Sequence, residues 1–228
     1  MVSLGNTVIT GGASGLGAAT VRAVQDAGGK PIVLDRRHPG GDVPFEQVDV
    51  AEREEVELAV RRVVERHGRI DAVVNAAGID ACGSLTDVPA ADWEKVLAVN
   101  LLGTAAVTRA ALPHLRDSGG RVVNCASTLG VRAVGDATAY CASKFGVVGF
   151  TRALAAETAG QVGVTLLIPG GMNTAFFDGR PEQYRPGPDA ALNDPEHVAE
   201  AVLFALTRPA GCEVREMVVC PAQEVSWP

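Results

Sequence analysis

Tyr140 and Lys144 are the residues whose types and spacing most clearly predict chemistry. They stand four positions apart in the segment Tyr-Cys-Ala-Ser-Lys, and residues at that spacing lie on one face of an α-helix. A free phenol has a pKa of about 10 and is a weak base at neutral pH. A nearby ammonium favours the phenolate, so we expect Lys144 to lower the pKa of Tyr140. Such a tyrosine suits general acid–base catalysis.

A second chemical feature is a glycine-rich segment near the N-terminus, Thr10-Gly11-Gly12-Ala13-Ser14-Gly15-Leu16-Gly17. It lies between a predicted strand and a predicted helix. Glycines let the backbone approach a pyrophosphate closely, and the free N–H groups of a helix N-terminus favour an anion. Because the spacing differs from GxGxxG, a tight turn without a ligand also fits the segment taken alone.

The elements that must position these residues alternate along the chain between short apolar runs and longer helical patterns. Strands are predicted at Leu4–Thr10, Pro31–Asp35, Phe45–Val48, Asp71–Asn75, Arg121–Cys125, Val162–Ile168 and Val214–Cys220. Helices are predicted at Gly15–Ala27, Glu52–His67, Asp92 to about Leu115 (in one part or two), Thr138–Ala159 and Pro195–Thr207. The pattern predicts one α/β domain over residues 1–228, a doubly wound parallel sheet of about seven strands with helices on both faces.

Composition and charge narrow the class of protein. The formal net charge of the 228-residue chain is −7, which argues against a nucleic-acid binder, because such proteins carry a basic patch or stripe. No apolar run approaches the roughly 18 residues that cross a bilayer, and Met1–Thr10 lacks the basic residues of a secretory signal. The cysteines and histidines show no metal-ligand spacing. We expect a cytoplasmic protein with no metal, nucleic-acid or membrane partner.

Taken together, the motifs resemble the short-chain dehydrogenase/reductase family, whose first turn reads TGxxxGxG. The further matches, in order, are Asn75-Ala76-Ala77-Gly78 after the fourth predicted strand, Asn100 in a helix, Ser127 after the fifth strand, the YxxxK pair, and Pro169-Gly170 with Thr174 after the sixth strand. The resemblance spans about Leu4 to Cys220. It implies a Rossmann-type fold and an oxidoreductase that transfers a hydride between a nicotinamide cofactor and a secondary alcohol or ketone.

The resemblance also implies roles for four catalytic residues. Tyr140 is the general acid/base, and Ser127 hydrogen-bonds the substrate oxygen and orients Tyr140. Lys144 holds the nicotinamide ribose, and Asn100 steadies a water that links Lys144 to solvent. The alternative for Asn100 is a satisfied polar residue that bends its helix, and both roles can hold together.

The cofactor is expected to contact the glycine-rich turn and the residues that follow the next strands. The implied contacts are Gly11, Ser14, Gly15, Leu16, Gly17, Asp35, Arg36, Asp49, Val50, Asn75, Ala76, Gly78, Tyr140, Lys144, Pro169, Gly170, Met172 and Thr174. Asp35 ends the second strand, where a carboxylate accepts hydrogen bonds from the adenosine ribose and repels a 2′-phosphate. This favours NAD, although Arg36 could pair with the 2′-phosphate of NADP.

The substrate and the partners are less well defined by the sequence. The Pro- and Gly-rich segment at about 175–194 is expected to form a short lid, in which Phe176 and Phe177 either contact the substrate or anchor the loop. Arg180 is expected to be solvated. Alternatives to the simple alcohol dehydrogenase are an NADPH-dependent reductase of a 3-oxoacyl or polyketide intermediate, and a nucleotide-binding regulatory protein without catalysis. Apolar helices at about 101–115 and 138–159 predict a homodimer or homotetramer.

Overall fold

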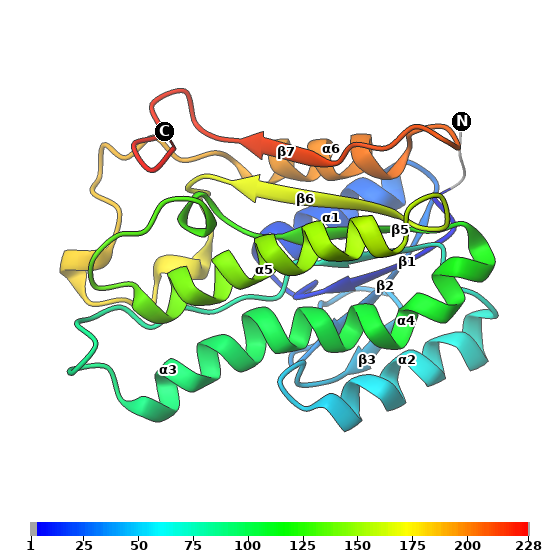
Figure 1. Cartoon of the computed structure of the whole chain (residues 1–228), viewed down its shortest axis with the longest axis horizontal. Helices are drawn as coiled ribbons and strands as arrows, with labels where there is room; N and C mark the ends of the chain where they lie inside the picture. Colours follow the sequence, from blue (N-terminus) through cyan, green and yellow to red (C-terminus); the bar gives the residue numbers. More distant parts are fainter. Residues whose placement is uncertain (1–3, 228) are drawn as a thin grey trace.

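The computed structural model describes residues 4–227, which contain one parallel sheet in the order β3-β2-β1-β4-β5-β6-β7 (Figure 1). The strands are β1 (Asn6–Thr10), β2 (Lys30–Asp35), β3 (Phe45–Gln47), β4 (Ala72–Asn75), β5 (Arg121–Cys125), β6 (Gly163–Pro169) and β7 (Glu216–Val219). The α-helices are α1 (Gly15–Asp26), α2 (Arg53–His67), α3 (Ala90–Leu97), α4 (Thr104–Ser118), α5 (Thr138–Glu157) and α6 (Pro195–Leu206). The predicted Rossmann-type fold is confirmed.

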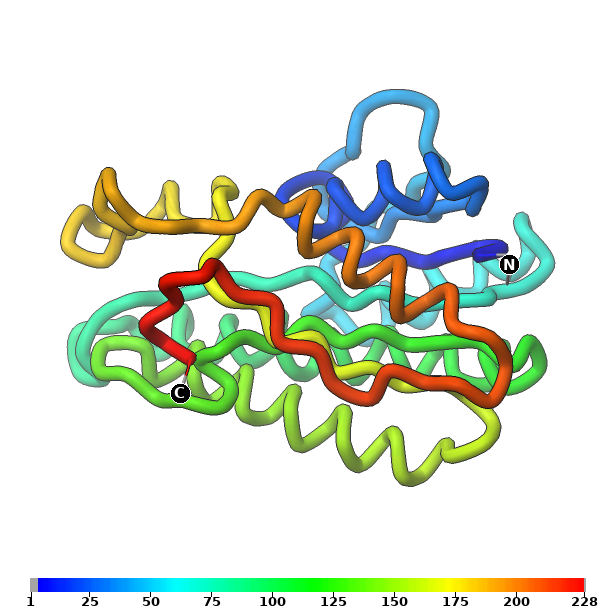
Figure 2. The backbone as a smooth tube through the Cα atoms, turned by 90° about the horizontal axis from the view of Figure 1, so that it is seen from above, coloured from blue at the N-terminus to red at the C-terminus, as the bar shows by residue number. Residues whose placement is uncertain are grey.

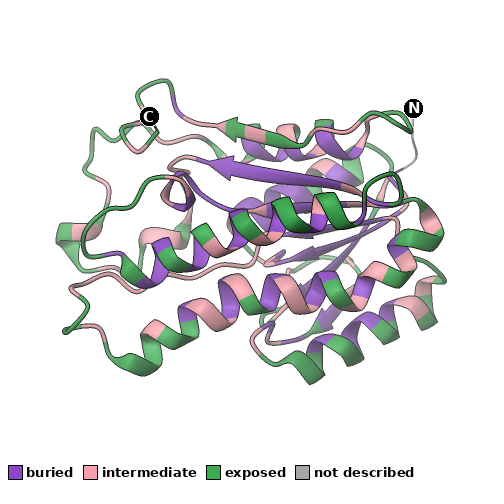
Figure 3. Ribbon diagram, in the orientation of Figure 1, coloured by how far each residue is buried: buried purple, intermediate pink, exposed green. Residues whose placement is uncertain are grey.

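Two apolar cores hold the helices against opposite faces of the sheet. Side chains alternate along a strand, so Val8 of β1 packs in the core beneath α2 and α4, whereas Ile9 packs in the core beneath α1 and α6. Figure 2 shows α1 and α6 running side by side on their face. Figure 3 shows that the inner strands are buried between the helices, whereas the edge strand β7 is partly exposed. The inner strands are therefore mostly apolar, as strands covered on both faces require.

The long helix predicted from Asp92 to about Leu115 is divided into three parts. Between α3 and α4, residues Ala98–Gly103 form a π-helical turn that contains Asn100, and such turns are frequent at functional sites. The run Ala90–Ser118 is long and apolar enough to span a membrane by length and composition, so the expectation of no such run was too strong. A core helix passes the same test, and Val107 and Leu115 of this run are fully buried beneath the sheet.

The strand order places a topological switch point between β1 and β4, in the middle of the sheet. The chain moves outward from β1 through β2 to β3 and then returns to pair β4 with the other side of β1. Ligands of open α/β sheets bind at the carboxyl ends of the strands beside such a switch point. The glycine-rich turn after β1 and the turn after β4 meet here, because Thr10 Oγ1 accepts hydrogen bonds from the backbone N–H groups of Ala76 and Ala77.

Candidate active site

Two adjoining cavities lie along the carboxyl ends of the strands. The first, of about 1030 Å³, extends from Gly11 past Asp35 to Val50. The second, of about 740 Å³, extends from Gly11 past Ser127 and Tyr140 to the segment after β6. Both share Gly11, Ser14, Arg37 and residues 77–79 in their walls. Together they form one elongated cleft across the switch point.

The glycine-rich turn is shaped by close backbone approaches. A Cβ on Gly17 would lie 2.1 Å from the carbonyl oxygen of Gly11, and Gly15 has a φ of +51°. Residues with side chains cannot meet either requirement without strain. α1 begins at Gly15 and directs its free N–H groups towards the cleft, which gives the turn the geometry of an anion-binding helix terminus.

The proposed catalytic residues Ser127, Tyr140 and Lys144 line the second cavity together. Tyr140 and Lys144 lie on adjacent turns of α5, with the Lys144 ammonium 5.6 Å from the centre of the Tyr140 ring. Lys144 is buried and donates a hydrogen bond to the carbonyl oxygen of Cys125 at 2.9 Å. Ser127 follows β5 and shares a side-chain hydrogen bond with Tyr140. Two elements, α5 and the end of β5, thus bring these side chains to one wall.

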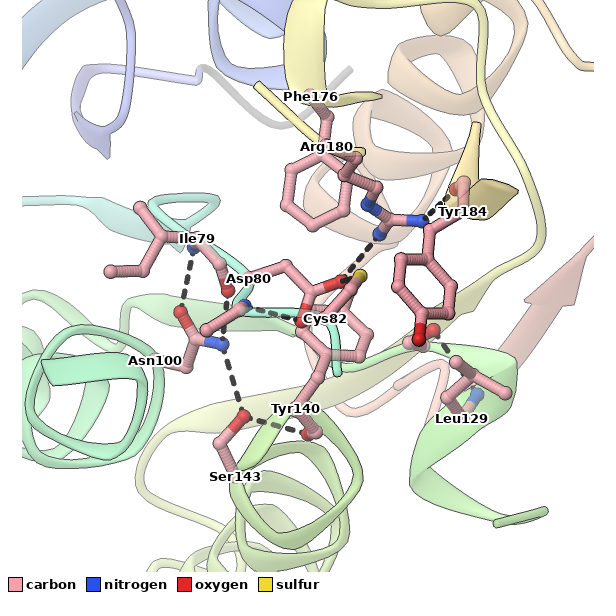
Figure 4. A network of polar contacts seen from close by, with 12 residues as sticks. Ile79, Asp80, Cys82, Asn100, Leu129, Tyr140, Ser143, Phe176, Arg180 and Tyr184 are labelled. Carbon is pink, nitrogen blue, oxygen red and sulfur yellow. Dashed lines mark hydrogen bonds and ion pairs between the residues drawn. The ribbon is translucent and has the colours of Figure 1, made fainter. Parts of the chain in front are cut away.

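Asn100 lies behind this wall and does not line either cavity. Its amide nitrogen donates to the carbonyl oxygen of Ile79 and to Ser143 Oγ, and its amide oxygen accepts the N–H of Ile79 (Figure 4). Ser143 Oγ in turn donates to the carbonyl oxygen of Tyr140. Asn100 therefore joins the turn after β4 to α5 at Ser143, the residue directly before Lys144. Sequence reasoning missed Ser143, although it stands inside the YxxxK signature.

The pKa of Tyr140 is raised above that of a free phenol, contrary to the prediction from the sequence. Burial is the largest cause, since it disfavours the phenolate. Cys125 and Asp80 raise the pKa further, whereas the hydrogen bond with Ser127 and the charge of Arg180 lower it. Burial also lowers the pKa of Lys144. The prediction was wrong because a single cation was weighed without the loss of solvent around the phenol.

The segment at about 175–194, which the sequence predicts to be a lid, carries a buried ion pair that the sequence did not predict. Arg180 Nη2 lies 2.6 Å from Asp80 Oδ2 in the turn after β4, with side chains 18% and 6% exposed (Figure 4). The guanidinium packs 5.0 Å from the ring centre of Phe176 and 4.6 Å from that of Phe177. Phe176 lies 5.7 Å from the Tyr140 ring. The expectation that Arg180 is solvated was therefore wrong, and the phenylalanines form part of the cavity wall and also hold the loop.

Polar groups at the other end of the cleft surround Asp35. Its carboxylate accepts hydrogen bonds from the N–H groups of Ala13 and Arg37. Arg37 donates to Ser14 Oγ at 3.2 Å, and Arg36 Nε lies 3.5 Å from Asp49 Oδ2. Arg37 lines both cavities, a position that sequence reasoning did not give it.

The structure brings most of the cofactor residues expected from the sequence to the cleft. Those in its walls are Gly11, Ser14, Gly15, Leu16, Asp35, Arg36, Asp49, Val50, Ala76, Gly78, Tyr140, Lys144, Pro169, Gly170, Met172 and Thr174. Two others lie outside the walls: Gly17 packs on the Gly11 carbonyl, and Asn75 is buried and donates to Thr108 and Asn124. Their contribution is to the shape of the turns.

No cluster of three or more metal-ligating side chains occurs among residues 4–227. The cleft also includes two residues of the C-terminal segment, Glu224 and Ser226, which no sequence motif indicated.

Comparisons with known proteins agree with this geometry. A family model described as short chain dehydrogenase matches residues 6–185. An uncharacterized oxidoreductase of Staphylococcus aureus (strain MW2) is 33% identical over 226 residues, covering 94% of this chain and 96% of its own. The 3-oxoacyl-[acyl-carrier-protein] reductase of Thermotoga maritima is 33% identical over 217 residues, covering 86% of this chain and 88% of its own.

Solved structures give the same result. An alcohol dehydrogenase from the archaeon Thermococcus sibiricus, complexed with 5-hydroxy-NADP, superposes with a TM-score of 0.84 at 27% identity, covering 94% of this chain and 95% of its own. The ligand-free aldohexose dehydrogenase of Thermoplasma acidophilum, at 24% identity and a TM-score of 0.85, covers 94% and 92% and shows the shared fold. The chain belongs to the short-chain dehydrogenase/reductase family and is an oxidoreductase of that family.

Proposed function

We propose that this oxidoreductase transfers a hydride between a nicotinamide cofactor and a secondary alcohol or ketone, with Tyr140 as the general acid/base. The observation that carries the proposal is the convergence of Ser127, Tyr140 and Lys144 in one cavity. That cavity adjoins the first one, which extends past Asp35 to Val50. The cleft therefore has the three proposed catalytic side chains in one cavity and the Asp35 carboxylate in the other. This arrangement suits an extended dinucleotide.

The residues of the cleft fit such a cofactor. The backbone approach at Gly11 and Gly17 leaves no room for side chains over the turn, and the N-terminus of α1 favours a pyrophosphate there. Asp35 accepts only two backbone hydrogen bonds, so its carboxylate can accept ribose hydroxyls as well. The cofactor, when bound, supplies or accepts the hydride.

The protein groups then handle the proton and the orientation of the substrate. Tyr140 takes the alcohol proton in oxidation and returns one to the carbonyl oxygen in reduction. Ser127 hydrogen-bonds the same oxygen and orients Tyr140. Lys144 holds the nicotinamide ribose, and Asn100 steadies a proton-relay water while it joins the turn after β4 to α5.

One cofactor measurement tests this proposal. Secondary alcohols and ketones are screened with NAD and NADP in both directions by absorbance of the reduced nicotinamide. We expect turnover with kcat/KM at least tenfold higher for NAD, because the Asp35 charge repels a 2′-phosphate. Asp35→Ser should move the preference towards NADP, since Arg36 and Arg37 remain beside the ribose pocket. A clear preference of the wild type for NADP would overturn the Asp35 argument.

A reductase of 3-oxoacyl or polyketide intermediates is the second candidate function. It is supported by the relative from Thermotoga maritima, which is a 3-oxoacyl-[acyl-carrier-protein] reductase. The same screen distinguishes it, because turnover would then need NADPH and a 3-oxoacyl thioester and would be absent with simple secondary alcohols.

We also propose that the protein forms a homodimer or homotetramer. We place it in the cytoplasm, with no nucleic-acid or membrane partner. α5 packs on the π-helical turn before α4, and Phe145 and Leu102 of these elements are 44% and 61% exposed. Large apolar side chains on neighbouring helices favour burial against a second copy. Sedimentation at micromolar concentration should give a dimer or tetramer, and a monomer alone would refute this part.

A further inference from the structure

The C-terminal segment after β7 closes the substrate end of the cleft. Gly171 donates its N–H to Glu224 Oε2 at 2.9 Å, and Arg132 donates to the carbonyl oxygen of Val225. Figure 2 shows the C-terminal end curling over the loop that follows β5. Glu224 and Ser226 line the same cavity as Ser127 and Tyr140. This segment therefore forms part of the wall of the second cavity, next to the loops that follow β5 and β6.

A directed chain of hydrogen bonds orients the Glu224 carboxylate. Ser226 donates both its N–H and its hydroxyl to Glu224 Oε1, at 3.0 Å and 2.6 Å. Because the single hydroxyl proton of Ser226 is used there, Thr128 must be the donor in the 2.6 Å contact between Thr128 Oγ1 and Ser226 Oγ. The chain begins at Thr128, next to Ser127, and ends on the carboxylate.

Glu224 keeps its charge although it is half-buried. Burial alone would raise its pKa, but the hydrogen bonds from Ser226 and Gly171 hold the pKa below its ordinary value. No cation forms an ion pair with Glu224 within residues 4–227. The cations in the cavity wall have other partners: Lys144 contacts Cys125, Arg180 contacts Asp80 and Arg37 contacts Ser14. The carboxylate is thus charged and lacks a cationic partner.

The groups around Glu224 supply hydrogen bonds but no positive charge. Ser226 donates two hydrogen bonds to Oε1 and Gly171 donates one to Oε2, and the backbone N–H of Val225 also lowers the pKa of the carboxyl. We propose that Glu224 is a specificity-determining residue, which selects substrates that carry a hydrogen-bond donor near the reacting carbon. It favours an ammonium group over a hydroxyl group at that position. It disfavours substrates with an acidic group there. The inference rests on the proposed function and names its substrate class.

Matched secondary alcohols test the ranking. The first set is 1-amino-2-propanol, 1,2-propanediol, 2-butanol and lactate, which differ only in the group beside the carbinol carbon. A second set places the same groups one methylene further from the carbinol carbon, and so tests how far from that carbon the Glu224 carboxylate can act. At pH 7.5 the amines are cationic and lactate is anionic. We expect kcat/KM to fall in the order given, with the ammonium substrate roughly tenfold to a hundredfold above 2-butanol.

Glu224→Gln is the decisive variant, because it keeps the shape and removes the charge. The advantage of the ammonium substrate should fall about tenfold or more, kcat/KM for 2-butanol should stay within about threefold, and that for lactate should rise. Glu216→Gln is the matched control: it makes the same change in net charge on β7, where Glu216 pairs with Arg152 outside the cavity, and should leave the ranking unchanged. Ser226→Ala retains the charge of Glu224 and should retain the order of substrates.

The outcomes separate this inference from the proposed function. Turnover with a flat ranking in the wild type, or an unchanged ranking in Glu224→Gln, overturns the role of Glu224 and leaves the dehydrogenase activity standing. Absence of turnover with every alcohol and ketone overturns the proposed function instead. In that case ligand-observed NMR on the enzyme with NAD still ranks binding of the same compounds, and equal binding of amine and acid overturns the inference.

Discussion

Replacing Tyr140 with Phe is expected to lower kcat by about 10²–10⁴-fold, a loss of roughly 3–5 kcal/mol of transition-state stabilisation. The substitution removes only the phenol hydroxyl, whose ionised form is stabilised by Ser127 and by the charge of Arg180. The ring stays packed beside Phe176. Binding of the cofactor, followed by fluorescence titration, should therefore change little.

The chain offers a matched control, because it contains just two tyrosines. Tyr184 lies in the lid segment and donates its hydroxyl to Asp136 Oδ2 at 3.0 Å. Tyr184→Phe removes the same atom away from the reacting groups and should keep kcat within a few-fold of the wild type. Full turnover by Tyr140→Phe, or an equal loss in both variants, would contradict the proposed role of Tyr140.

The raised pKa of Tyr140 predicts how the rates of oxidation and reduction depend on pH. The groups that face the phenol are Cys125, Asp80 and Arg180, from β5, the turn after β4 and the lid, with Lys144 on its own helix. Oxidation needs the phenolate, so its rate should rise as the pH is raised above neutral. Reduction needs the phenol, which is already the dominant form, so its rate should stay level through neutral pH. The rise in the oxidation rate with pH should be absent in Tyr140→Phe.

Replacing Asp80 with Asn is expected to release the lid segment. Removing one partner of a buried ion pair costs about 3–5 kcal/mol when the other charge stays buried. Arg180 can avoid most of that cost, because it lies on a surface segment that can detach and return the guanidinium to water. We therefore expect a small change in Tm but a KM at least tenfold higher, since Phe176 leaves its place beside Tyr140.

Limited chymotrypsin digestion measures the release of the lid directly. Cleavage after Phe177 and Tyr184, neither of which precedes a proline, should accelerate by about tenfold to a hundredfold in Asp80→Asn, because proteolysis follows the population of the opened segment. The double variant Asp80→Asn with Arg180→Gln restores a neutral pair, and its KM should lie closer to that of the wild type. Unchanged KM in Asp80→Asn would show that the ion pair does not hold the lid in place.

The sequence predicted those parts of the site that depend on local pattern. Apolar runs located the strands, and the spacing of Tyr140 and Lys144 placed both on one face of α5. Motifs at strand ends necessarily meet at one edge of a parallel sheet, so Ser127 and Gly170 reached the same cavity. These inferences need only the periods of helix and strand.

The missed features all depend on contacts between distant segments. Asp80 and Arg180 are 100 residues apart in the chain, and Gly171 and Glu224 are 53 apart. Neither pair belongs to a repeating pattern, and each lies in a loop whose path is set by packing. The pKa of Tyr140 was missed for the same reason, because burial by the lid and β5 is a tertiary property.

Transfer of deuterium from the cofactor to the substrate carbon tests the central claim most directly. The enzyme is incubated with a ketone panel and reduced cofactor deuterated at the transferable C4 position, and the alcohols formed are analysed by mass spectrometry. We predict a product that carries one deuterium on its carbinol carbon with the wild type, and at most trace product with Tyr140→Phe. Alcohol without deuterium, or no product from any ketone with either cofactor, would contradict the proposed hydride transfer.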